Sequence, residues 1–208
     1  MTSIHTASRV ELIVLLCLML VAMIWSYIGA HDPLTWWLEV IPVMIGLPLA
    51  WLTRSRFPLT RLLYWLLFVH ALILILGGHY TYARVPLGFW LQDWFDLSRN
   101  HYDRLGHLAQ GFIPAILARE ILFRNQVVTK KGWLFFLSVC VCLAFSALYE
   151  LIEWWAAIAV SEAADAFLGT QGDVWDTQWD MFMALIGAVL ANLVLARVHL
   201  AQMGAKKA

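Results

Sequence analysis

Residues 133–160 read WLFFLSVCVCLAFSALYELIEWWAAIAV, and they indicate the fold class of the whole chain. From Trp133 to Tyr149 this stretch contains no Asp, Glu, Lys or Arg. It is longer than the roughly 20 predominantly apolar residues that a helix needs to cross a bilayer. The stretch therefore predicts a membrane-spanning helix that carries Glu150 and Glu153 in one of its halves.

The rest of the chain has the same character. Hydrophobic residues make up 62% and charged residues 13%, and the mean hydropathy is +0.73. Soluble domains average roughly 45–50% apolar and about 25% charged residues. The sequence therefore predicts an all-α, polytopic transmembrane bundle of about six spans, forming a single integral membrane domain over residues 1–208. The predicted spans are approximately 10–29, 34–52, 62–78, 102–123, 133–160 and 179–197, and residues 80–101 are expected to form the main loop outside the membrane.

The basic residues predict the orientation, because Lys and Arg in short loops are retained on the cytoplasmic side. With the amino terminus inside, 11 of the 14 basic residues lie on the cytoplasmic side and only Arg84, Arg99 and Arg104 lie outside. Both termini are therefore expected in the cytoplasm. The 11 residues are Arg9, Arg54, Arg56, Arg61, Arg119, Arg124, Lys130, Lys131, Arg197, Lys206 and Lys207.

Several function classes are disfavoured by what the chain does not contain. The 14 basic residues balance the 14 acidic ones, and no basic block alternates with aromatic residues, so nucleic acid is not an expected partner. The sequence has no HExxH, GxSxG, P-loop or paired CxxC motif. The three cysteines lie in apolar runs and are expected to be buried hydrophobes. His5 and His199 are expected at the surface.

The acidic residues gather on the predicted outer side, and some lie on helices. Asp103 and His107 are four residues apart on the fourth predicted span, so they share a face with Gln110. Glu150 and Glu153 are three apart on the fifth, and Asp173, Asp176 and Asp180 form a stripe leading into the sixth, which also carries Asn192. The outer acidic set is Asp32, Asp93, Asp96, Asp103, Glu162, Asp165, Asp173, Asp176 and Asp180.

A carboxylate inside a bilayer is costly and usually faces the bundle interior with a partner. The three faces are therefore expected to converge on one polar pocket, with His70 and His79 approaching from the third span. Such a pocket can bind a divalent metal ion, activate water or relay protons. The alternative is a structural network of ion pairs with Arg99 or Arg104. The predicted catalytic residues are His107, Glu150 and Glu153, and the predicted metal ligands are Asp103, His107, Asp176 and Asp180.

These motifs resemble the YjdF family of bacterial inner-membrane proteins, a domain of unknown function. The resemblance covers nearly the full length and is carried by residues 101–107, 149–154 and 172–181. A weaker resemblance is to VanZ-like membrane proteins. Their pattern also has an acidic residue and a His on one helix, a Glu on the next helix and then a pair of Asp residues. On that analogy, the matched polar positions are Asp103, His107, Glu150 or Glu153, Asp176 and Asp180. A second Glu and a longer tryptophan-rich outer segment depart from that pattern. The resemblance implies a location in the bacterial inner membrane and a shared polar core.

Three functions follow as hypotheses. The first is a membrane-embedded enzyme or envelope-processing factor, with or without help from a divalent metal ion, acting from the periplasmic side on a lipid-linked or amphiphilic substrate. The second is a small proton-coupled transporter in which Glu150 and Glu153 alternate their protonation. The third is a non-catalytic membrane scaffold. In each case, membrane lipids surround the protein.

Overall fold

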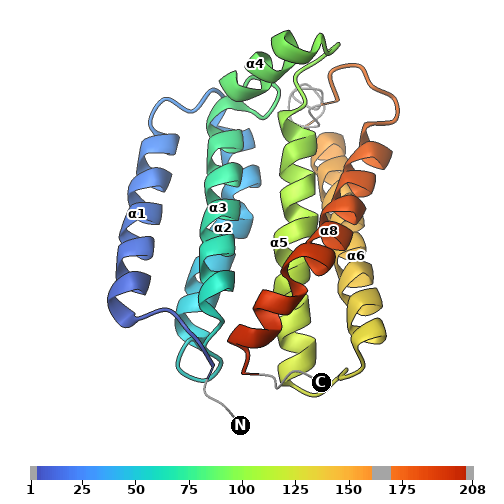
Figure 1. Ribbon diagram of the computed structural model, residues 1–208. Coiled ribbons are helices and arrows are strands. Elements are labelled where there is room, and N and C mark those ends of the chain that lie inside the picture. Colours follow the sequence, from blue (N-terminus) through green and yellow to red (C-terminus); the bar gives the residue numbers. More distant parts are fainter. Residues whose placement is uncertain (1–3, 161–169, 205–208) are drawn as a thin grey trace.

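The computed structural model describes residues 4–160 and 170–204, and every regular element in these ranges is an α-helix (Figure 1). The all-α helical bundle expected from the sequence is thereby confirmed. Glu162, Asp165, Lys206 and Lys207 lie outside the described residues. The helices are α1 (Arg9–Tyr27), α2 (Pro33–Thr53), α3 (Arg61–Tyr80), α4 (Pro86–Phe95), α5 (Tyr102–Arg124), α6 (Lys131–Val160) and α8 (Asp176–Gln202).

Local sequence signals explain where several of these helices begin. Ser8 caps α1, because its hydroxyl oxygen accepts a hydrogen bond from the backbone N–H of Glu11 at 3.1 Å. Asp32 caps α2 in the same way, through a 2.7 Å bond from the Thr35 N–H, and Pro33 follows at the first helical position. Proline suits that position because its missing N–H has no partner in the first turn. The cap at Asp32, with Pro33 after it, ends the short turn between α1 and α2.

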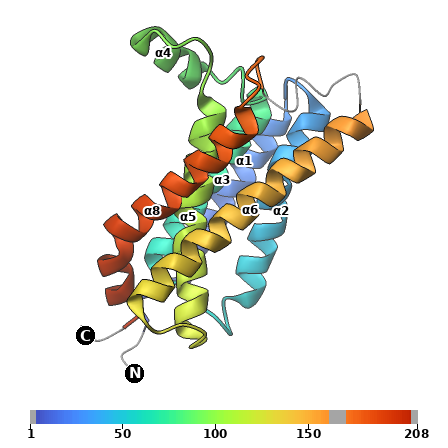
Figure 2. The ribbon, with the colours of Figure 1, turned by 90° about the vertical axis from the view of Figure 1, so that its right-hand side faces the viewer.

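The helices form two groups that meet at the centre. α1, α2 and α3 make up one group, and α5, α6 and α8 make up the other (Figures 1 and 2). α3 packs against α5 and joins the two groups. α5 therefore has neighbours on several sides, and its buried residues run from Tyr102 to Glu120.

The closest packing in the bundle is between α5 and α8, and small residues permit it. A Cβ atom added to Gly111 would collide with the backbone carbonyl of Ala184, and one added to Gly187 would collide with the carbonyl of Leu108. Small residues let membrane helices approach until their backbones touch. His107 and Asp180 each lie one turn from this crossing, toward the amino-terminal ends of their helices, so the crossing brings their side chains together.

Five described helices, namely α1, α2, α3, α6 and α8, are long and apolar enough to cross a membrane. α5 was also predicted as a span, but it is not among the five. Its sequence carries charged residues near both ends, including Asp103, Arg104, Arg119, Glu120 and Arg124. The protein is thus a multi-span helical membrane bundle. Six spans remain a prediction, because that number requires α5 to cross the membrane as well.

The expectation of a plain loop over residues 80–101 was wrong in part, because α4 occupies its middle. Pro86 begins this helix and Asp96 ends it with a left-handed backbone conformation. α4 lies across one end of the bundle (Figure 1). Trp90, Trp94 and Phe95 are 58–75% exposed. Exposed tryptophans on a short amphipathic helix are typical of the boundary between bilayer and water.

A buried polar network lies at the opposite end, where the first and last described residues come together. The His5 N–H donates to the Gln202 carbonyl at 2.8 Å. Nearby, the fully buried Glu120 carboxylate accepts hydrogen bonds from Thr60, Arg124 and His199. The expectation that His199 lies at the surface was therefore wrong. Its ring is fully buried because Glu120 on α5 pairs with it across the helix interface.

Candidate functional site

Side chains from α5, α6 and α8 meet near the end of the bundle from which α4 extends (Figure 2). His107 Nε2 lies 3.7 Å from Asp103 Oδ1 on the same helix and 3.6 Å from Glu150 Oε1 on α6. On α8, Asp180 completes a group with Asp103 and His107 in which one possible ligand atom from each residue lies within 4.8 Å of the others. The structure therefore brings together four of the six residues predicted for the site.

These groups are shielded from solvent, and some of their polar atoms are unpaired. His107 is 5% exposed and Asp180 is 2% exposed. Glu150 Oε1, Asp180 Oδ1 and His107 Nδ1 are buried and have no hydrogen-bond partner within the described part of the chain. Buried polar groups are nearly always satisfied in native proteins, and each exception calls for an explanation such as an ion or water. Glu150 Oε1 is 3.6 Å from His107 Nε2, and His107 belongs with Asp180 to the group whose ligand atoms lie within 4.8 Å of one another.

Glu153, predicted as a catalytic residue, is buried one turn beyond Glu150 toward the α4 end. It lies close enough to Glu150, Asp103 and Glu39 for the charges of these groups to interact. The carboxylates of the site thus form a continuous group that extends from α8 across α6 and α5 to α2.

Glu39 is a site residue that the sequence analysis missed. It is 5% exposed on α2, and its Oε2 accepts a 2.9 Å hydrogen bond from the Tyr149 hydroxyl on α6. Tyr82, in the connection between α3 and α4, also neighbours Glu39. The signal that identifies Glu39 is its position as the single ionisable residue inside an otherwise apolar span, since such residues usually mark functional sites.

Asp176 belongs to a different arrangement, although it was predicted as a metal ligand. Its Oδ1 accepts a 2.5 Å bond from Arg99, which is itself only 8% exposed. Asp173 pairs with Arg104 at 2.6 Å. By contrast, among the described residues no Lys or Arg forms an ion pair with Asp103, Glu150 or Asp180. The ion-pair network with Arg99 and Arg104 thus involves Asp173 and Asp176, whereas a metal site at Asp103, His107 and Asp180 stays a prediction.

The arginine pairs hold the chain ahead of α8 against the start of α5. Arg99 also donates to the Thr170 carbonyl at 2.5 Å, and the side-chain amide of Gln171 donates to the Asn100 carbonyl at 2.8 Å. A hydrogen bond from the Trp175 N–H, followed by the charge of Arg104, holds the pKa of Asp173 below its usual range. Asp173 therefore stays ionised at neutral pH, and the clamp positions α8 beside α5.

The remaining predicted neighbours lie elsewhere. His79 Nδ1 is 2.7 Å from the Ser26 carbonyl and its ring stacks on Trp25 of α1. His70 lines an apolar cavity between α1, α2 and α3. Asn192 lies deeper in the bundle, where its Oδ1 accepts a 3.0 Å bond from Arg119. The expectation that the third span brings histidines to the acidic site was therefore wrong, because His79 contacts α1 and His70 lines the cavity between α1, α2 and α3.

The donor set formed by Asp103, His107 and Asp180 is chemically suited to a divalent cation. Two carboxylates and one imidazole are common ligands of Zn²⁺, Mn²⁺ and Fe²⁺. Glu150 lies beside them and can act as a further ligand or as a proton acceptor. The arrangement suits metal binding, water activation and proton transfer, all within one shielded space.

Comparison with known proteins identifies the family of the chain. The family model described as "Predicted membrane protein (DUF2238)" matches residues 11–201. The inner membrane protein YjdF of Escherichia coli (strain K12) is 57% identical over 181 residues, which cover 87% of each chain. No solved structure matches.

The resemblance inferred from residues 101–107, 149–154 and 172–181 is therefore confirmed. The identity to an inner membrane protein and the apolar helices together place this chain in the inner membrane, which it crosses several times. The matched region includes all of α2 to α6 and nearly all of α1 and α8. The chain thus belongs to the DUF2238 family of membrane proteins.

Proposed function

We propose that the protein is a membrane-embedded, metal-assisted enzyme that acts on an amphiphilic or lipid-linked substrate from the periplasmic side. The observation that carries this proposal is the Asp103, His107 and Asp180 group, whose ligand atoms lie within 4.8 Å of one another. Unpaired buried oxygens on Asp180 and Glu150 favour a cation there. A cation would offset the cost of holding these carboxylates in a shielded place.

Asp103, His107 and Asp180 would hold the ion. A bound divalent cation would supply Lewis acidity and a lowered pKa for bound water. Glu150, whose Oε1 is 3.6 Å from His107 Nε2, is placed to accept the proton of an attacking water. Glu153 lies next to Glu150 and can share that proton. Two neighbouring carboxyl groups that share one proton repel each other less than two ionised carboxylates do.

The position of the site supports an amphiphilic substrate. The acidic group lies near the end of the bundle from which α4 extends, and α4 carries the exposed Trp90 and Trp94. A substrate anchored in the bilayer would present its polar part at this level. The phosphoester or amide bond of a lipid-linked molecule is the kind of bond that water activation by Glu150 would cleave.

Cation binding is the first test of this function. Zn²⁺ added to the purified, chelator-treated protein is expected to raise its Tm by several degrees, because a ligand at 100 times its Kd stabilises a folded protein by about 2.7 kcal/mol. Asp180→Asn and His107→Ala are expected to abolish the rise. Asp93→Asn is the matched control, because Asp93 is exposed on α4. A rise that persists in Asp180→Asn, or no rise with Zn²⁺, Mn²⁺ or Mg²⁺, contradicts the proposal. Either result would favour the other two hypotheses, the proton-coupled transporter and the non-catalytic scaffold.

The orientation of the bundle has a separate test. A phosphatase fused after Ala208 is expected to be inactive and a fluorescent protein at the same place is expected to fold, because the carboxyl terminus would be cytoplasmic. Fusions after Gly29, in the α1–α2 turn, are expected to give the reverse result. Periplasmic activity after Ala208 would place the acidic site on the cytoplasmic side and exclude a periplasmic substrate.

A further inference from the structure

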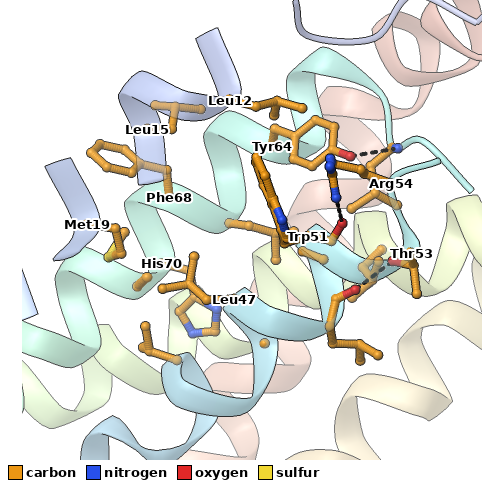
Figure 3. A pocket seen from close by; sticks show the side chains of 18 of the residues that line it. Leu12, Leu15, Met19, Leu47, Trp51, Thr53, Arg54, Tyr64, Phe68 and His70 are labelled. Atoms are coloured by element: carbon orange, nitrogen blue, oxygen red, sulfur yellow. Dashed lines mark hydrogen bonds between the residues drawn. The ribbon is translucent and has the colours of Figure 1, made fainter. Parts of the chain in front are cut away.

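A cavity of about 490 Å³ lies between α1, α2 and α3, well apart from the acidic group. Its walls are mainly aliphatic and aromatic side chains of these helices (Figure 3). The carboxyl-terminal part of α5 contributes Leu117 and Ile121. It extends along α2 from Pro42 to Arg54. At 1.5 Å per helical residue, this corresponds to a length of about 18 Å. The volume is within the usual range of small-molecule sites, roughly 300–1,000 Å³.

A cationic side chain lies at the end of this cavity that adjoins the chain termini. Arg54 stacks over the Trp51 ring, with its guanidinium carbon 3.7 Å from the ring centre, and donates to the Trp51 carbonyl (Figure 3). Within the described residues no carboxylate forms an ion pair with Arg54. Arg56, two residues further along, is exposed. One end of a mostly apolar cavity is therefore positively charged.

A second polar atom lies deeper in the cavity. His70 lines the wall, and its Nε2 is buried with no hydrogen-bond partner within the described part of the chain. Figure 3 shows the His70 ring beside Leu47, four residues before Trp51 on α2. Arg54 follows Leu47 by seven residues, which corresponds to about 10 Å along the helix. A ligand that places an anion at Arg54 can therefore meet His70 with a polar atom about 10 Å further along the cavity.

We propose that this cavity binds an anionic phospholipid, with an acyl chain between α1, α2 and α3 and the phosphate at Arg54. The ligand class follows from the chemistry of the walls, because an apolar cavity with one cationic end matches a molecule with an apolar chain and one anionic end. The cavity is separate from the acidic group, and the two sites lie toward opposite ends of α2. Lipid binding here does not depend on the proposed enzymatic activity.

Filling the cavity tests the proposal, and the chain offers a matched pair of glycines. Gly46 lines the cavity, and an added Cβ there would meet no atom within 4 Å. Gly132, at the start of α6, has the same open surroundings but does not line the cavity. Phosphatidylglycerol or phosphatidylcholine is added to the detergent-purified protein, and bound lipid is counted by native mass spectrometry. Gly46→Phe is expected to lower retention of phosphatidylglycerol at least tenfold, whereas Gly132→Phe leaves it unchanged.

The charge is tested separately with Arg54→Gln. The native protein is expected to retain phosphatidylglycerol in preference to phosphatidylcholine, and the substitution is expected to reduce that preference about fivefold, as for the loss of one basic residue near an anionic head group. Thermal unfolding of each variant verifies that the helices remain packed. Equal retention of both lipids by the native protein, or unchanged retention in a folded Gly46→Phe variant, would overturn the proposal.

Discussion

Glu120→Ala is expected to destabilise the folded protein by about 3–5 kcal/mol, as is typical when one partner is removed from a buried ion pair. The Glu120 carboxylate is fully buried and accepts hydrogen bonds from the Thr60 hydroxyl at 2.8 Å, Arg124 at 2.6 Å and His199 at 2.9 Å. The substitution would leave all these donors without their acceptor. Equilibrium unfolding in mixed detergent micelles measures the loss of stability.

Glu11→Ala is the matched control for this change. Glu11 also pairs with an arginine, since Arg61 Nε lies 2.8 Å from its Oε1, but the Arg61 side chain is 50% exposed. Exposed ion pairs contribute only about 0–1 kcal/mol. A loss of less than 1 kcal/mol in Glu120→Ala would mean that the network at this end does not hold α3, α5 and α8 together.

Gly111→Val is expected to cost about 3 kcal/mol, at the upper end of the range for overpacked interiors. The new side chain would collide with the Ala184 carbonyl. Because that atom belongs to the backbone, no rotamer change relieves the collision and α5 must separate from α8. The same separation would move His107 away from Asp180, so stabilisation by Zn²⁺ should also be lost. Unfolding curves recorded with and without Zn²⁺ measure both effects.

Gly132→Val serves as the control, because the space around Gly132 is open. If Gly111→Val retained native stability together with native stabilisation by Zn²⁺, then direct backbone contact between α5 and α8 would not be what positions the site.

Much of the candidate site could be predicted because its spacing is local. Asp103 and His107 had to share a face of any helix that contained both, since residues four apart are neighbours on a helix surface. The facing residues on α6 and α8 could be expected because ionisable groups in a membrane bundle turn toward its interior. No local pattern, however, shows which carboxylate takes an arginine partner. Arg99 lies before α5, and it reaches Asp176 only because the loop before α8 folds back over it.

Local sequence patterns also could not predict that some polar residues at the helix ends are buried. His199 lies in the last turn of α8 and was expected at the surface, yet it is fully buried against Glu120. α4 was missed for a related reason. Ten residues between Pro86 and Phe95 are too few to cross a bilayer, and their aromatic side chains fit an interfacial loop as well as a helix. In both cases the outcome depends on what lies next to the segment in space.

The sequence by itself determined that this protein is an all-helical membrane bundle with its acidic residues gathered toward one end. Those properties depend on apolar length and on helical spacing, both of which are local. The tertiary structure alone decided that Asp103, His107 and Asp180 lie together, that Asp176 pairs with Arg99 and that Glu39 joins from α2. It also decided where the apolar cavity lies. These features depend on which helices touch and at what height. For Asp103, His107 and Asp180, that is set by the close approach of α5 and α8 at Gly111 and Gly187.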